Sequence, residues 1–243
     1  MLAWGMPPLL SKLLSAPPQR KIALGLSMVL VLTTLGICAN RQVSCWSNSK
    51  TLFSHALAVT QNNYIAYNNL GITYGKLGSY QEAIDACKQA IKIKPDLVQA
   101  HYNLGYAYSR LGRYQEAINA YKQAIKIKPD YADAHYNLGS AYGKLGRWPE
   151  EIEACKQTIR IKPDYVNAHN NLGVAYGNLS RYKEAIEAFK QTIKIKQDYA
   201  DAHYNLGSAY LAIGDKNAAL AEYNILKSLN SESASKLLNQ INQ

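Results

Sequence analysis

The sequence of 243 residues is poor in cysteine and has no acidic residue before Glu82. Its four cysteines include no Cys-x-x-Cys pair, so neither a disulfide framework nor a zinc site is indicated. The sequence also has no glycine-rich phosphate loop and no nucleophile elbow. We therefore predict that the chain is not an enzyme and has no catalytic residue, no metal site and no cofactor.

Basic residues outnumber acidic ones, but the excess is unevenly distributed. The formal net charge is +10, and residues 1–63 carry five basic side chains and no acidic one. After residue 63, the other 22 of the 27 basic side chains accompany 17 acidic ones. Much of the excess positive charge therefore lies beside an apolar segment, and we predict no nucleic-acid partner.

An uncharged, apolar run extends from Ile22 to Ala39. At about 1.5 Å per residue it spans roughly 27 Å, enough for the hydrocarbon core of a bilayer. We predict a transmembrane helix over residues 22–39, preceded by an N-terminal basic segment over residues 1–21. A cleaved signal peptide is the alternative, but the long leading segment with two Pro-Pro pairs favours the membrane helix.

The flanking charges give a weak orientation signal. Lys12, Arg20 and Lys21 precede the apolar run, and Arg41 and Lys50 follow it. Positive charge is retained on the cytoplasmic side of membranes. We therefore predict a single-pass protein with a cytoplasmic N-terminus and the rest of the chain on the outer side, periplasmic or lumenal.

A unit of 34 residues recurs through the rest of the chain. Leu-Gly pairs fall at this spacing from Leu70-Gly71 to Leu206-Gly207. A tyrosine follows three residues after each of these glycines, and a proline ends the first three units, with Gln197 in its place in the fourth. Five copies at one spacing identify a repeat protein.

This pattern closely resembles the tetratricopeptide repeat (TPR), a unit of two antiparallel helices. The resemblance implies an all-α fold, a right-handed superhelix or α-solenoid, preceded here by one transmembrane helix. Residues 40–63 form a junction with a half-repeat helix, and residues 231–243 form a C-terminal capping helix. The five repeats are expected at residues 64–97, 98–131, 132–165, 166–199 and 200–230.

The signature positions have packing roles, and two of them vary. A small residue of the second helix is alanine in four repeats but Glu151 in the third. A larger core position holds Cys87, Tyr121, Cys155, Phe189 and Tyr223. Glycine is expected in the left-handed conformation that ends each first helix, with Ser180 in the fourth copy at a cost of order 1 kcal/mol.

Histidines and lysines also recur with the repeat. His101, His135, His169 and His203 share one position on the first helix, a repeat apart, so packing explains them better than metal binding. Lysines cluster at the ends of second helices, where they favour the negative helix terminus. They are Lys92, Lys94, Lys126, Lys128, Lys162, Lys194 and Lys196.

An asparagine precedes every Leu-Gly pair, and the packing roles described above do not explain it. We name Asn69, Asn103, Asn137, Asn171 and Asn205 the asparagine ladder. Their amides offer both a donor and an acceptor, which suits the backbone of an extended peptide. The Asn-Asn-Leu-Gly phrasing at residues 68–71 and 170–173 resembles the TPR region of O-linked N-acetylglucosamine transferase, a family that has such a ladder on its concave face.

Three tyrosines directly before ladder residues, Tyr102, Tyr136 and Tyr204, are predicted to add stacking contacts to a bound peptide. The asparagines have an alternative explanation, since they also fit local helix packing. The two interpretations differ in whether the ladder binds a protein or peptide partner.

The junction carries a second resemblance. Residues 41–64 are similar to the segment that joins the last membrane helix to the first repeat in polytopic TPR proteins, including the transmembrane mannosyltransferase family. Two functions follow. One is a membrane-anchored scaffold that binds an extended peptide in its concave groove. The other is the acceptor-binding C-terminal part or subunit of a split or truncated membrane glycosyltransferase, with the catalytic subunit as a partner.

Overall fold

The computed structural model describes residue 17 and residues 26–38, 48–229 and 231–242. It divides into two units, residues 1–59 and residues 60–243. The described part of the first unit contains a helix over residues 26–38, with every side chain exposed, and α3 (Ser49–Val59). Most of the predicted basic segment and residues 22–25 and 39 of the predicted membrane helix lie outside the described residues. Among the helices that the structure describes, none is both long enough and apolar enough to cross a membrane.

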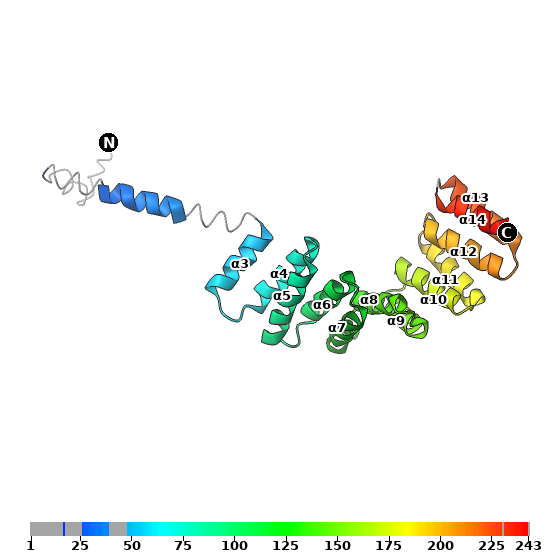
Figure 1. The fold of residues 1–243 in the computed structure, drawn as a ribbon, viewed down its shortest axis with the longest axis horizontal. Coiled ribbons are helices and arrows are strands. Elements are labelled where there is room, and N and C mark those ends of the chain that lie inside the picture. The colour runs from blue at the N-terminus through cyan, green and yellow to red at the C-terminus, as the bar shows by residue number, and fades with distance from the viewer. Residues whose placement is uncertain (1–16, 18–25, 39–47, 230, 243) are drawn as a thin grey trace, which may run out of the picture. The chain divides into compact units, whose positions relative to one another are not determined.

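The second unit is built from pairs of antiparallel helices, and no strand occurs among the described residues. Figure 1 shows these helices following one another in chain order. The first helices of the pairs are α4 (Tyr64–Lys76), α6 (Val98–Arg110), α8 (Ala132–Lys144), α10 (Val166–Asn178) and α12 (Ala200–Ala212). The second helices are α5 (Tyr80–Ile93), α7 (Tyr114–Ile127), α9 (Trp148–Ile161), α11 (Tyr182–Ile195) and α13 (Lys216–Ser228). The prediction of an all-helical solenoid is thus confirmed.

Two residues after the end of each first helix, the backbone has a positive φ. Gly78, Gly112, Gly146 and Gly214 have φ between 70° and 82°, and Ser180 has φ 56°. The N–H of the following residue returns to the last turn, as in the 2.9 Å bond from Arg113 N to Tyr108 O. The turn therefore needs the left-handed conformation, which Ser180 adopts at a cost of order 1 kcal/mol that glycine does not incur.

Close approach of the two helices in each pair requires glycine at the Leu-Gly position. A Cβ placed on Gly105 would lie 2.7 Å from the Tyr121 ring, and one on Gly173 would lie 2.5 Å from the Phe189 ring. Around these contacts, Ala117 and Ala185 are fully buried. The core of the second and fourth repeats is therefore a large ring packed against a bare backbone, whereas Cys87 and Cys155 lie at the equivalent glycines of the first and third.

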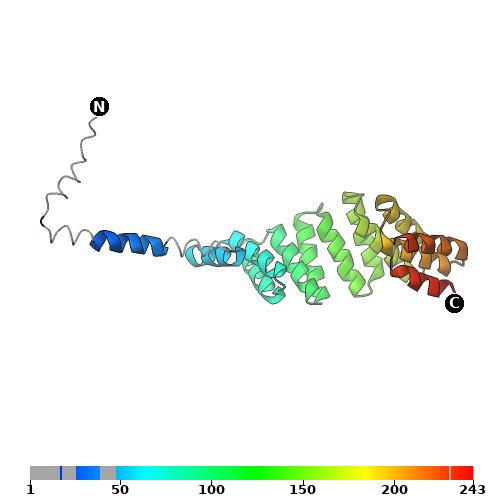
Figure 2. The same cartoon turned by 90° about the horizontal axis from the view of Figure 1, so that it is seen from above.

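The first helices line the inner, concave face of the array. Successive first helices pack directly against each other, whereas each second helix packs against the first helix of the next repeat. Figure 2 shows the helix pairs stacked one after another. The last pair is covered by α14 (Ser233–Ile241), whose Leu237 and Ile241 are buried, with Leu237 packed at Gly207.

We expect Gly105→Ala to lower the free energy of unfolding by about 1–3 kcal/mol, because the Tyr121 ring must move to admit a methyl group. Gly75→Ala is the matched control, since nothing lies within 4 Å of a Cβ at that position. That variant should keep or raise stability, by up to about 1 kcal/mol from helix propensity. Denaturant unfolding measures both. Equal effects of the two substitutions would contradict the packing described here.

Candidate functional site

The asparagine ladder lies on the concave face, and most of its members bond back to the preceding repeat. Asn103 Nδ2 donates to Asn68 Oδ1 at 3.2 Å, and Asn137 Nδ2 donates to the Tyr102 hydroxyl at 2.9 Å. Asn205 Nδ2 donates to Asn170 Oδ1 at 3.4 Å. Asn171 bonds the Tyr136 side chain in the same way. The ladder is thus also a set of ties between neighbouring repeats.

These ties leave part of each amide unused. A primary amide has two N–H donors and an oxygen that accepts two hydrogen bonds. The contact to the preceding repeat takes one N–H, and at Asn103 the oxygen also accepts a 3.1 Å bond from Gln99 Nε2. Asn69, on the first helix of the array, makes no such bond within the described unit. The ladder therefore keeps donors and acceptors for a ligand while it holds the repeats in register.

The predicted tyrosines lie in two different environments. The Tyr102 ring packs on Tyr131 with centroids 5.0 Å apart, and Tyr136 stacks on Tyr165 at 4.9 Å. Burial raises the pKa of Tyr102 to about 12, so this hydroxyl stays protonated. The Tyr204 hydroxyl instead accepts a 3.1 Å bond from Gln240 of α14. The capping helix therefore contacts Tyr204, while the side chains of Tyr102 and Tyr136 bond the ladder residues Asn137 and Asn171.

The repeated histidines bind backbone carbonyl groups. The Nε2 atoms of His101, His135 and His169 lie 2.8–2.9 Å from the oxygens of the prolines that end the preceding repeats. His203 makes the same contact with Gln197 O at 2.8 Å. No group of three or more potential ligands among the described residues is arranged to hold a metal ion. These side chains therefore hold successive repeats together.

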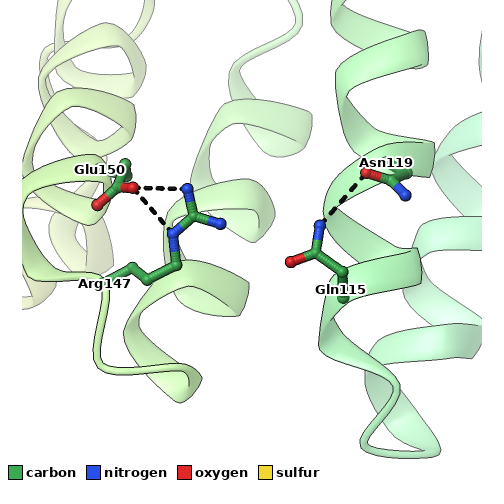
Figure 3. Close-up of polar contacts among 4 residues, drawn as sticks. All are labelled: Gln115, Asn119, Arg147 and Glu150. Atoms are coloured by element: carbon green, nitrogen blue, oxygen red, sulfur yellow. Dashed lines mark hydrogen bonds and ion pairs between the residues drawn. The ribbon is translucent and has the colours of Figure 1, made fainter.

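Polar side-chain pairs lie on the surface at the N-terminal ends of the second helices. Arg147 Nη2 lies 2.6 Å from Glu150 Oε1, and the Gln115 amide donates to Asn119 Oδ1 at 3.4 Å on α7 (Figure 3). The Arg147 guanidinium also lies 4.6 Å from the Tyr142 ring centre. The Arg147 hydrogen bond lowers the pKa of Glu150. The same Arg–Glu pair occurs in the second and fourth repeats. It therefore has a structural role, joining the turn between the two helices to the first turn of the second helix.

Two equivalent cavities open on the concave face, three repeats apart. One, of about 240 Å³, lies between α4 and α6 and is lined by Gly75, Ala83 and Asn103 among others. The second, of about 230 Å³, lies between α10 and α12 beside Gly177 and Asn205. Larger cavities of about 630 and 380 Å³ lie between second helices on the opposite face and include none of the predicted site residues. We place the site on the concave face because the ladder lies there.

Among the residues that the structure describes, Glu151 is the one buried acid. Only 4% of the residue is exposed, and its Oε2 atom has no hydrogen-bond partner. Burial raises its pKa to about 7, against a smaller opposing effect of Lys144. The sequence marks this position as an exception to alanine, but it does not show where the carboxyl group points.

We expect the buried carboxyl group to make stability depend on pH. The folded-state pKa of about 7 exceeds the ordinary value of 4.5, so unfolding releases a proton between these values and the free energy of unfolding falls as pH rises from about 4.5 to about 7. Tyr136 and Lys144 on α8 and Cys155 on α9 are the titratable groups that interact with this carboxyl.

Between pH 5 and pH 8, the free energy of unfolding of the natural chain should therefore fall by about 2–3 kcal/mol more than that of the Glu151→Ala variant. Glu153→Ala, which removes an exposed acid from the same helix, is the control and should follow the natural chain. Thermal or denaturant unfolding at both pH values gives the measurement. Parallel pH dependence for the natural chain and Glu151→Ala would show that this carboxyl ionises as readily in the folded as in the unfolded chain.

Comparison with known proteins covers the whole array. Tetratricopeptide-repeat models match residues 64–97, 86–119, 132–165, 154–187 and 200–232, and a TPR repeat model matches residues 110–146 and 178–214. The chain is similar to Protein O-mannosyl-transferase Tmtc2 of Drosophila melanogaster, with 30% identity over 91 residues. That match covers 37% of this chain, which spans about a tenth of the relative's length.

Solved structures show the same architecture. A MamA protein structure is 27% identical with a TM-score of 0.67, and the match covers 71% of this chain and 94% of that one. YrrB, described as a TPR protein with an unusual peptide-binding site, is 20% identical with a TM-score of 0.68, over 77% of this chain and 97% of that one. The likeness to YrrB is one of fold. Repeat spacing, helix pairing and family matches together show that this chain belongs to the tetratricopeptide-repeat family.

Proposed function

We propose that the array is a protein-interaction scaffold whose concave face binds an extended peptide segment of a partner protein. The observation that carries this proposal is the asparagine ladder, which brings one amide per repeat to a single face and leaves each with unused hydrogen-bonding capacity. An extended peptide presents its N–H and C=O groups at regular intervals, so a row of amides matches its backbone whatever its side chains are.

The lysines fit a peptide groove better than a polyanion site. Lys128 and Lys162 lie 5.5 Å from the ring centres of Tyr131 and Tyr165, at the ends of second helices. Lys196 lies 5.5 Å from the Tyr199 ring in the same arrangement, whereas Lys94 lies 5.0 Å from the ring of Tyr64, at the start of the first helix of its own repeat. These cations are distributed one per repeat and paired with aromatic rings, which supports a peptide or protein as the partner.

The test uses peptides selected from a random dodecapeptide phage library on the full chain. Replacing Asn69, Asn137 and Asn171 together by alanine removes up to three hydrogen bonds of about 0.5–1.5 kcal/mol each. The dissociation constant should rise by roughly one to three decades. Because two of these residues also tie repeats together, helical content and melting are measured alongside binding.

Asn119→Ala is the matched control, because it deletes the same amide from the outer surface of α7 (Figure 3). It should change the dissociation constant by less than about twofold. Unchanged binding by the triple variant would overturn the peptide groove. Loss of binding on replacing Lys126 and Lys128, with a steep dependence on salt, would instead indicate an electrostatic partner.

We further propose that residues 22–39 attach the scaffold to a membrane, with the array on the outer side. The uncharged run and its flanking charges support this proposal. The full chain should stay with the membrane fraction after carbonate extraction, and protease added outside should cleave the array. Recovery of the full chain in the aqueous fraction would refute membrane attachment.

A second candidate function is acceptor binding for a membrane glycosyltransferase. The 30% identity to a region of Protein O-mannosyl-transferase Tmtc2 favours it. Under this proposal, the catalytic membrane helices belong to another polypeptide or to a longer form of this one. An adjoining reading frame that encodes further membrane helices and an acidic loop would support this function. Absence of any glycosyltransferase among the proteins bound by the chain would argue against it.

A further inference from the structure

The concave face is not uniform from repeat to repeat, because the core position that packs on the Leu-Gly glycine varies. In the second repeat the Tyr121 ring crosses Gly105, and its hydroxyl lies 3.5 Å from Ser109 Oγ. In the first repeat Cys87 stands in place of that ring and Ala83 is the small residue. A cavity of about 240 Å³ lies there beside Gly75, and an equivalent one of about 230 Å³ lies beside Gly177 in the fourth repeat, where Phe189 holds the core position.

The third repeat also has a cysteine, Cys155, in place of the ring. At the position where the other repeats have alanine, however, it has Glu151. The carboxyl group of Glu151 lies against Gly143, since a Cβ placed on that glycine would lie 2.5 Å from its Oε2 atom. Gly143 occupies the repeat position of Gly75 and Gly177, which line the two concave cavities. The carboxyl therefore points to the concave face at the middle of the ladder.

The Glu151 carboxyl group lacks a nearby positive charge and a complete set of hydrogen-bond partners. Its Oε2 atom has no hydrogen-bond partner, and the only basic group that influences it is Lys144, whose side chain is exposed. The other interacting groups, Tyr136 and Cys155, bear no positive charge. A buried carboxylate without a partner is costly, and a cationic donor is the group that would best relieve that cost.

We propose that Glu151 is a specificity-determining residue of the groove and accepts a basic side chain, lysine or arginine, from the bound peptide. The ammonium or guanidinium group would enter over Gly143, where the helix has no side chain to block it. This inference rests on the proposed peptide groove, and it adds charge selectivity at one repeat to the sequence-independent contacts of the ladder.

The experiment compares peptides selected from the dodecapeptide phage library on the full chain and on Glu151→Ala. The natural chain should enrich peptides with lysine or arginine at one fixed position. Changing that lysine to norleucine in a synthetic peptide should weaken binding by about 10- to 100-fold on the natural chain. On Glu151→Ala the two peptides should bind equally, while Glu153→Ala should discriminate as the natural chain does.

Folding does not confound the comparison, because alanine is the residue that the other four repeats carry at this position. Enriched peptides without a fixed basic residue, or discrimination that survives in Glu151→Ala, would overturn the role of Glu151 and leave the peptide groove standing. Enrichment of no peptide on the natural chain would overturn the groove itself, and this inference with it.

Discussion

The close approach of two helices at each Leu-Gly pair is the constraint on which the array depends. Glycine there brings the backbone of the first helix against a ring such as Tyr121 or Phe189 of the second. No pair can bury its apolar surface alone, so each second helix also packs on the next first helix. This stacking puts the five first helices side by side and makes one continuous concave face from residues 34 apart in sequence.

The same constraint makes function depend on departures from the repeat consensus. In the second repeat, the Tyr121 hydroxyl reaches Ser109 on the first helix. Beside Gly75 and Gly177 a cavity remains, whereas in the third repeat the Glu151 carboxyl group lies at the equivalent Gly143. Stability comes from what the repeats share, and under the proposed function specificity would come from the positions at which they differ. The asparagine ladder serves both, because one amide bonds the neighbouring repeat and still has capacity for a ligand.

Much of the fold was predictable from sequence, because a fixed spacing of glycine, tyrosine and proline determines helix ends and packing. Even the left-handed conformation at Ser180 follows from its place in the register. Contacts across repeats were harder to predict. The bonds from Asn103 to Asn68 and from Gln240 to Tyr204 join residues 35 and 36 positions apart, and side-chain direction decides them. The exception at Glu151 was visible, but the position of its carboxyl group against Gly143 depends on how α8 and α9 pack.

The most direct test of the central claim is to locate the bound peptide on the array. A photo-crosslinking residue at Ser140, which shares its repeat position with Val174 and Ser208 of a concave cavity, is compared with one at Gln123, which lines a cavity on the opposite face, each in the full chain. We expect a library-selected peptide to crosslink at residue 140 and not at residue 123. Crosslinking confined to residue 123 would place the peptide on the second helices and contradict a concave binding groove.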